Sequence, residues 1–216
     1  MTGLPSFRRR KPVNDSDLHI ERLNLNQDPD AAMWLRILLH KHPEVYYHSS
    51  RVAMLAEKIA EPLELSDEET RQLVRGCFLH DIGKSVIPRE TLTQREPFTS
   101  SQWDLIKQHP IVGARMAESN PGFSKEIVQI IRHHHERWDG RGYPDGLSGE
   151  EIPLGARICA VIDAFDSMTS NKVYRRSIQV SEARLELIRY ANVQFDPDVV
   201  HAMVKLPIET LSIFSL

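Results

Sequence analysis

The chain has 216 residues, of which 41% are hydrophobic and 26% charged, a composition typical of a domain with a sizeable core. Lys and Arg number 27 against 30 Asp and Glu, a net charge of −3 that argues against binding of a polymeric nucleic acid by the whole surface. No apolar run approaches the roughly 20 residues of a membrane helix, and none follows the basic run Arg8–Lys11, so we expect neither membrane insertion nor a signal peptide.

The only two cysteines, Cys77 and Cys159, lie in apolar helical patterns and form no CxxC pair. This usage is typical of buried thiols in a reducing compartment, so the sequence predicts a cytoplasmic protein.

Residues 1–28 are polar and lack periodicity, and we interpret them as an N-terminal tail. Apolar residues at helical spacing predict helices over 30–41 and 44–61. The second helix carries His48 on its apolar face, and Glu44 lies one turn earlier, so both side chains can reach the same point.

The next helix begins at a capping box, Ser66–Glu69, and ends near the pair His80-Asp81. We expect Gly83 to stop this helix and a loop to follow over 86–97. A second capping box, Thr99–Gln102, begins a further short helix.

The helical pattern is interrupted at His109-Pro110 and resumes over 112–118. Ser124 is expected to cap a helix whose apolar face carries His134, and a strongly apolar helix over 156–168 follows a glycine-rich loop.

Ser181 is expected to cap a helix that ends near residue 191, and Asp196-Pro197 to begin a last helix. No sustained period-2 pattern is present, so the sequence predicts an all-α fold, an irregular bundle of about seven to nine helices. We divide it into the tail, a catalytic domain over 29–205 and a short apolar segment over 206–216 that docks on the body.

Several polar residues lie on apolar helix faces or at helix ends, where burial without partners costs several kcal/mol each. A shared cation removes that cost, and histidines with carboxylates but no thiolates favour Fe, Mn or Zn. The set is too large for one ion, so we expect two or three metals about 3.5–4 Å apart, bridged by Asp81, that activate water and polarise phosphoryl oxygens for phosphoester hydrolysis. The candidate ligands are Glu44, His48, His80, Asp81, His109, His134, His135 and Asp163.

Each candidate taken alone has a simpler interpretation, since His48 or His109 could be an ordinary hydrogen-bonded buried histidine. Asp166 is expected to support a neighbouring loop rather than to bind metal. His133 lies about 100° around the helix from His134 and is not expected to be a ligand.

The sequence resembles the HD-GYP family, a subgroup of the HD metal-dependent phosphohydrolases, from about Glu44 to Val204. The resemblance is carried by the motifs His48–Val52, His80–Lys84, His109-Pro110, His134–Leu147, Ile152–Leu154, Ala156–Ile158, Asp163–Asp166 and Phe195–Pro197.

The resemblance implies an HD-type helical fold, the eight metal ligands named above, and two or three divalent metals, with Fe or Mn favoured. Glu44 matches the glutamate of trinuclear members and so implies a third metal. Lys84 and Asp81 are the implied catalytic residues, Lys84 acting at the scissile phosphate. The implied substrate contacts are Gly142, Tyr143, Pro144, Lys172 and Arg175, with Lys172 replacing the arginine usual in the family.

The resulting prediction is a cytoplasmic cyclic di-GMP phosphodiesterase that yields pGpG and, by further hydrolysis, GMP. One alternative is a phosphohydrolase acting on another cyclic dinucleotide or on a nucleotide. The other is a signalling module that binds cyclic di-GMP without turnover or docks diguanylate cyclase (GGDEF) domains through the loop around Tyr143.

Overall fold

The computed structural model describes residues 29–171 and 176–212, and the regular secondary structure of this part of the chain consists of helices, without a β-strand. The all-α prediction is confirmed. No helix in the described ranges is long and apolar enough to cross a membrane. The elements are α2 (Pro29–Lys41), α3 (Pro43–Ala60), α4 (Asp67–Leu79), the 3-10 helix η2 (Ile82–Val86), α5 (Arg89–Thr93), α6 (Ser100–Ile106), α7 (His109–Glu118), α8 (Lys125–His133), the 3-10 helix η3 (Gly149–Glu151), α9 (Leu154–Thr169), α10 (Val180–Arg189), α11 (Pro197–Lys205) and α12 (Ile208–Ser212).

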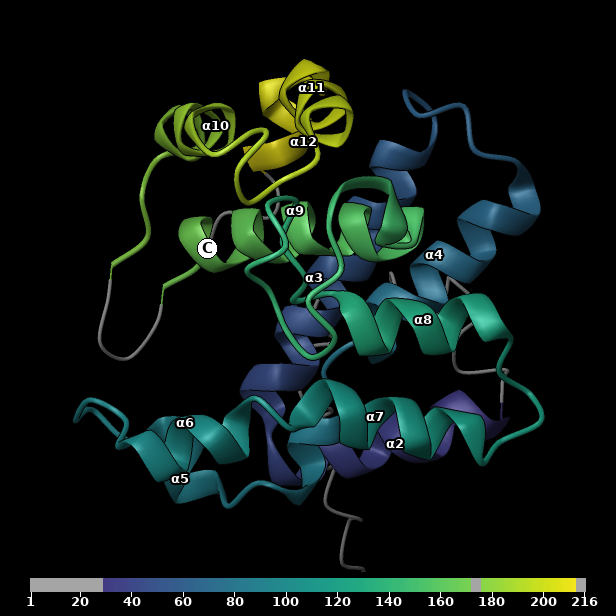
Figure 1. Cartoon of the computed structure of the whole chain (residues 1–216), viewed down its shortest axis with the longest axis vertical. Helices are drawn as coiled ribbons and strands as arrows, with labels where there is room; N and C mark the ends of the chain where they lie inside the picture. The colour runs from purple at the N-terminus through teal and green to yellow at the C-terminus, as the bar shows by residue number, and fades with distance from the viewer. Residues whose placement is uncertain (1–28, 172–175, 213–216) are drawn as a thin grey trace, which may run out of the picture.

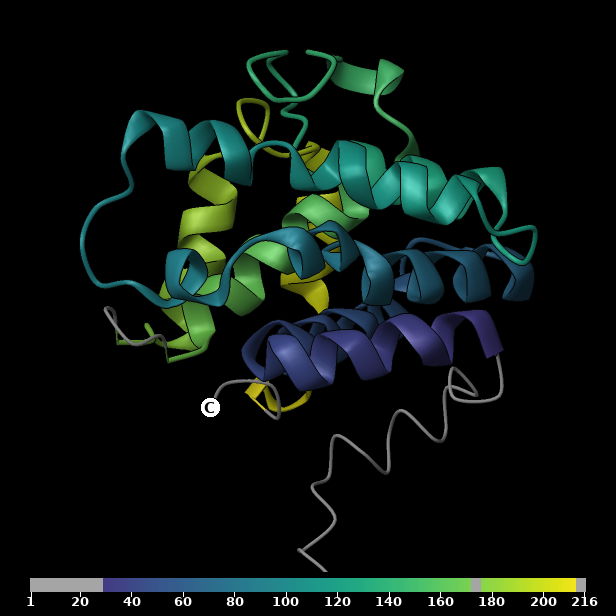
Figure 2. The same ribbon diagram turned by 90° about the horizontal axis from the view of Figure 1, so that it is seen from below.

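The helices form three tiers (Figure 1). Helices α10, α11 and α12 lie at one end, α2, α5, α6 and α7 at the other, and α3, α4, α8 and α9 between them. Helix α3 packs against α2, α4 and α9, while α8 packs against α4, α7 and α9. The chain between α5 and α6 projects from the body as a long connection, which Figure 2 shows at the left.

Local sequence signals explain where several helices begin. The Ser66 hydroxyl accepts from the Glu69 backbone N–H, and the Glu69 carboxylate accepts from the Ser66 backbone in return. Thr99 and Gln102 form the same reciprocal pair at the start of α6. Both predicted capping boxes are confirmed, and each satisfies backbone donors that a helix N-terminus leaves without intrahelical partners.

Two sequence predictions are wrong in detail. The region 86–97, expected to be a loop, contains the end of η2 and all of α5. Helix α10 is capped by Gln179 rather than by Ser181, two positions earlier than predicted, and the Glu182 carboxylate accepts from the Gln179 backbone N–H.

Gly83 does not end a helix by adopting a left-handed conformation. A β-carbon at this position would overlap the His109 carbonyl oxygen and lie 2.7 Å from the Gly113 backbone nitrogen. The glycine therefore permits close backbone contact between η2 and α7, and this contact brings the start of α7 beside the end of α4.

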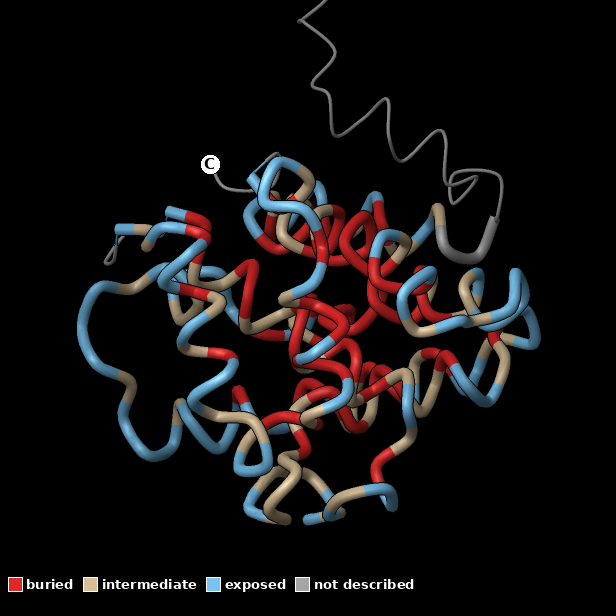
Figure 3. The backbone as a smooth tube through the Cα atoms, turned by 90° about the horizontal axis from the view of Figure 1, so that it is seen from above, coloured by how far each residue is buried: buried red, intermediate tan, exposed pale blue. Residues whose placement is uncertain are grey.

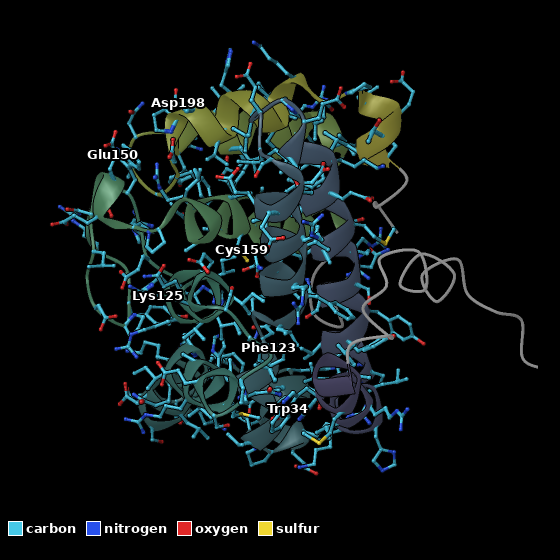
Figure 4. All side chains as sticks on the ribbon, turned by 90° about the vertical axis from the view of Figure 1, so that its right-hand side faces the viewer. Trp34, Phe123, Lys125, Glu150, Cys159 and Asp198 are labelled. Atoms are coloured by element: carbon cyan, nitrogen blue, oxygen red, sulfur yellow. The ribbon has the colours of Figure 1, made fainter. Side chains whose placement is uncertain are left out.

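The core runs through the middle tier, where the backbone is mostly buried while the α5–α6 connection is mostly exposed (Figure 3). Cys159 lies on α9 at the centre of the molecule (Figure 4), and Cys77 is likewise fully buried and free, as expected. Within the predicted C-terminal segment, Leu211 of α12 is fully buried. The predicted tail, residues 1–28, and residues 213–216 lie outside the described part of the chain.

Candidate metal centre

Histidines and carboxylates from five helical segments converge between α3, α4, α7, α8 and α9. Three groups of three ligand atoms form there, and within each group the atoms lie within 4.8 Å of one another. Two of these groups share no residue, and we call them the carboxylate group, which is His48, His80 and Asp163, and the imidazole group, which is His109, His134 and His135. The third, His80, Asp81 and His134, combines one histidine of each with Asp81.

Asp81 lies between the two groups and is 1% exposed. Its Oδ1 faces the imidazole group, 3.2 Å from His109 Nε2 and 3.9 Å from His134 Nε2. Its Oδ2 faces the carboxylate group, 3.5 Å from His80 Nε2 and 3.9 Å from His48 Nε2. One carboxylate thus presents an oxygen atom to each group, which is the arrangement a bridging ligand requires.

Three of the histidines are oriented by backbone carbonyls. In His80, His109 and His134, Nδ1 lies 2.6, 2.7 and 2.8 Å from the carbonyl oxygen three residues earlier. Each of these carbonyls belongs to the last turn of a helix, where no intrahelical donor is available. Since a carbonyl only accepts, Nδ1 carries the proton and Nε2 presents its lone pair to the centre.

His48 is held differently, because it lies in the interior of α3 rather than at a helix end. Its Nδ1 lies 2.7 Å from Asp166 Oδ2, a carboxylate one turn beyond Asp163 on α9. Arg51, one turn after His48, donates to both oxygens of Asp166 at 2.6 and 3.0 Å. Asp166 therefore supports a candidate ligand, a role that the sequence interpretation did not assign to it.

The protonation states favour metal binding in the imidazole group. Burial, with the neighbouring His135 and His80, holds the pKa of His134 well below its usual range, and burial lowers the pKa of His135 to about 3. Both rings are consequently neutral near pH 7, as a metal ligand must be.

The carboxylates are ionised. Burial alone would raise the pKa of Asp81, but Lys84 and the surrounding histidines outweigh it and hold the pKa well below the usual value. Burial acts in the same direction on Asp163, whose pKa the neighbouring His48 nevertheless keeps well below its usual range. The centre therefore combines the neutral imidazoles of His134 and His135 with the anionic oxygens of Asp81 and Asp163.

The arrangement of acceptor atoms fits a bound cation. His109 Nε2 and His134 Nε2 lie 3.2 Å apart, and both rings already carry their proton on Nδ1. Two lone pairs therefore face each other beside the anionic Asp81 Oδ1, an unfavourable arrangement unless a positive charge lies among them. His80 Nε2 and Asp81 Oδ1 are also buried without a hydrogen-bond partner.

Two predicted residues lie at the edge of the centre. Lys84 is 22% exposed and donates to Asp81 Oδ2 at 2.6 Å, so its charge is adjacent to the bridging carboxylate. Glu44 is 42% exposed, is not part of either group, and lies 3.5 Å from Arg89 of α5. The third metal expected from Glu44 stays a prediction.

The loop that follows α8 contacts the metal centre through Tyr143. Tyr143 donates its backbone N–H to the His135 carbonyl, and the two rings lie 4.9 Å apart at a 31° tilt. Gly142 is required here, because a β-carbon would lie 2.5 Å from Glu136 Cα. Pro144 follows Tyr143 through a cis peptide bond.

Glu136 and Asp145 hold the second half of this loop. Glu136 is 3% exposed, and its Oε1 accepts from the backbone N–H groups of Asp145 and Gly146. The Asp145 carboxylate accepts two hydrogen bonds from Arg132 and lies 3.0 Å from His133 Nε2. The His133 side chain thus contacts Asp145, and it is not among the residues of the two ligand groups.

The sequence interpretation missed Asp166 and Arg51 as parts of the centre. A signal was present, because His48 and Arg51 are three residues apart on one helix and Asp163 and Asp166 three apart on another. The predicted substrate contacts Lys172 and Arg175 lie outside the described residues.

Comparison with known proteins shows the family to which the chain belongs. The HD domain family pattern matches residues 33–199. The chain is 38% identical over 177 residues to the cyclic di-GMP phosphodiesterase PA4108 of Pseudomonas aeruginosa, covering 82% of this chain and 42% of that protein. It is 30% identical over 203 residues to the 3'3'-cGAMP-specific phosphodiesterase 3 of Vibrio cholerae, covering 94% of this chain and 42% of that protein.

Solved structures share the fold. The HDG"Y"P protein Bd1817 of Bdellovibrio bacteriovorus superposes with a TM-score of 0.63 at 21% identity, covering 88% of this chain and 67% of that one. The HD domain of the Listeria monocytogenes phosphodiesterase PgpH gives 0.59 at 21% identity, covering 82% of this chain and 94% of that one.

The chain therefore belongs to the HD domain family. Within it, the His134–Leu147 motif and the relatives named as cyclic di-GMP phosphodiesterases place it with the HD-GYP proteins. It spans less than half the length of curated relatives that it matches, 42% of the Pseudomonas aeruginosa protein and 48% of a cyclic di-GMP phosphodiesterase of Thermotoga maritima.

Proposed function

We propose that this chain is a metal-dependent phosphodiesterase that hydrolyses cyclic dinucleotides, with cyclic di-GMP as its substrate. One observation carries the proposal: Asp81 presents one oxygen to each of two ligand groups, so a pair of divalent cations can share it. Relatives named for hydrolysis of cyclic di-GMP or 3'3'-cGAMP support the substrate class.

The residues that would hold the cations are the two ligand groups and Asp81, and Fe or Mn are the proposed metals. When bound, such cations supply an activated water and stabilise charge on a phosphoryl group. The chain itself contributes fixed imidazole tautomers, a buried anionic bridge and the Lys84 ammonium, which can donate to a phosphoryl oxygen. Tyr143, beside His135, is placed to limit the substrate space over the imidazole group.

The test pairs metal analysis with hydrolysis of cyclic di-GMP, 3'3'-cGAMP and cyclic di-AMP under anaerobic conditions. The decisive comparison is His134→Gln against its neighbour His133→Gln. We expect His134→Gln to lose metal and turnover while His133→Gln retains metal, since His133 contacts Asp145 and not the centre. Metal binding without hydrolysis of any of the three compounds would overturn the proposed activity.

The product is proposed to be pGpG, with further hydrolysis to GMP. Docking of GGDEF domains by the loop around Tyr143 stays a prediction. Co-purification of a GGDEF domain with the wild-type chain, lost when Arg141 is replaced by Glu at the exposed side of the loop, would support it.

A further inference from the structure

We infer that the two metal positions are inequivalent, and that the buried pair Asp166–Arg51 sets the affinity of the carboxylate group alone. The inference rests on the proposed metal centre, but it concerns metal affinity and not the substrate.

The two groups differ in the atoms they offer. The imidazole group provides three nitrogen ligands, and His109 and His134 are oriented by neutral backbone carbonyls. The carboxylate group includes the anionic oxygen of Asp163, and its His48 is oriented by a second carboxylate, Asp166. A carboxylate partner makes an imidazole a stronger electron donor than a carbonyl partner does, so the same cation should bind the two groups with different affinity.

The helix position of each histidine explains why only one has a carboxylate partner. His80, His109 and His134 follow or adjoin helix C-termini, where unused carbonyls lie close to Nδ1. His48 lies five residues into α3, where the preceding carbonyls accept from the helix itself. Its Nδ1 must therefore bond to another element, and α9 supplies Asp166.

Arg51 fixes the position of Asp166. The guanidinium donates to both carboxylate oxygens, and the Ser170 hydroxyl donates to Oδ1 at 3.4 Å. Asp166 is 1% exposed, so water does not compete for these bonds. With Asp166 held and His48 Nδ1 bound to it, His48 Nε2 is directed at Asp163 Oδ1, 3.1 Å away, where a shared cation would lie. Asp166 and Arg51 are positioning residues, since neither is part of a ligand group.

The chain offers a close chemical copy of this arrangement outside the centre. Asp145 accepts from Arg132 through two hydrogen bonds of 2.8 Å and lies 3.0 Å from His133 Nε2. Asp145→Asn thus removes the same charge from the same kind of Arg–Asp–His unit, but around a histidine that binds no metal in this scheme.

The experiment is a titration of the metal-free chain with Co²⁺, followed by calorimetry and by visible absorption. We expect two classes of site in the wild type. Asp166→Asn should lower the Co²⁺ affinity of one class of site by about 10–100-fold and leave that of the other class unchanged. Asp145→Asn should leave the Co²⁺ affinity of both classes unchanged. Two equivalent sites in the wild type, an equal loss at both sites in Asp166→Asn, or no loss in that variant would each overturn the inference.

Arg51→Met is a second test variant, for the case in which Asp166→Asn does not fold. It keeps the Asp166 carboxylate and removes the two hydrogen bonds from Arg51 that hold it. If circular dichroism shows that Asp166→Asn is unfolded, the Co²⁺ titration of Arg51→Met tests the inference instead. Weaker Co²⁺ binding at one class of site supports the inference, and unchanged affinity at both classes overturns it. Failure of the proposed activity is recognised separately, as wild-type protein with two metal classes that leaves all three cyclic dinucleotides intact.

Discussion

Lys84 and His80 meet at a single atom, Asp81 Oδ2, which lies 2.6 Å from the ammonium nitrogen and 3.5 Å from the imidazole Nε2. The ammonium group is therefore adjacent to the carboxylate that would bridge the two cations. It lowers the electron density that Asp81 offers to metal, and it is placed to donate to a phosphoryl oxygen. These two effects oppose each other and can be separated by mutation.

Replacing Lys84 with Met should leave metal content equal to or higher than that of the wild type, while kcat falls by about 10²–10³-fold, since a donor to developing negative charge is lost. Metal analysis and steady-state hydrolysis measure the two effects. Lys107→Met serves as the control, because Lys107 is exposed and pairs with Asp104. Loss of metal in Lys84→Met would contradict this account.

The stability of the metal-free chain should depend on pH through His48. Burial lowers the pKa of His48, but hydrogen bonds to Asp163 and Asp166 outweigh it and raise the pKa to about 9, above the 6.5 of an unfolded histidine. Protonated His48 therefore stabilises the fold fully below pH 6.5, and this contribution is lost as the pH rises through 9. Urea unfolding at pH 7 and pH 9 should show the decrease, and His48→Gln should abolish it.

Metal affinity should change with pH in the opposite direction. Since a ligand imidazole must be neutral, a cation bound at His48 displaces its proton at any pH between 6.5 and 9. The apparent affinity of that position should rise about tenfold per pH unit in this range. Titrations in buffers of different ionisation enthalpy report the released proton, and a binding constant that does not vary with pH would contradict the assignment.

Gly83→Ala should destabilise the fold far more than its size suggests. The added β-carbon would overlap the His109 carbonyl, so the backbone of η2 or α7 must move. We expect a loss of about 3 kcal/mol or more in the free energy of unfolding. The matched change Gly149→Ala has open space around its β-carbon but a φ of +53°, and should cost about 1–2 kcal/mol. Equal losses in the two variants would show that the close contact is unimportant.

Glu136→Leu should free the loop around Tyr143 without removing metal. The backbone N–H groups of Asp145 and Gly146 would lose their acceptor, so their amide hydrogen exchange should become faster. Glu136→Gln keeps an acceptor oxygen and should restore slow exchange. Unchanged exchange in Glu136→Leu would mean that the Arg132–Asp145 pair alone holds the loop.

Much of the fold follows from local sequence signals, as the capping boxes at Ser66 and Thr99 show. The direction of His134 also followed from apolar periodicity, because one face of α8 packs against the core. The role of Asp166 could not be predicted from such a pattern, because its contact with His48 joins residues that lie 118 positions apart in the sequence. Glu44 was expected to reach the same point as His48. It lies 3.5 Å from Arg89 instead, and Arg89 belongs to α5, a helix in the region that was predicted to be a loop.

His80, His109 and His134 are each oriented by a backbone carbonyl, and this affects which positions of the centre can vary among related proteins. A main-chain oxygen is present whatever the side chain, so residues 77, 106 and 131 can be exchanged for others of similar size without disturbing the imidazoles that depend on them. His48, in contrast, relies on the Asp166 side chain, which a single codon change can alter. Natural variation in metal preference should therefore accumulate on the α3–α9 side of the centre, while the α7–α8 side stays chemically constant.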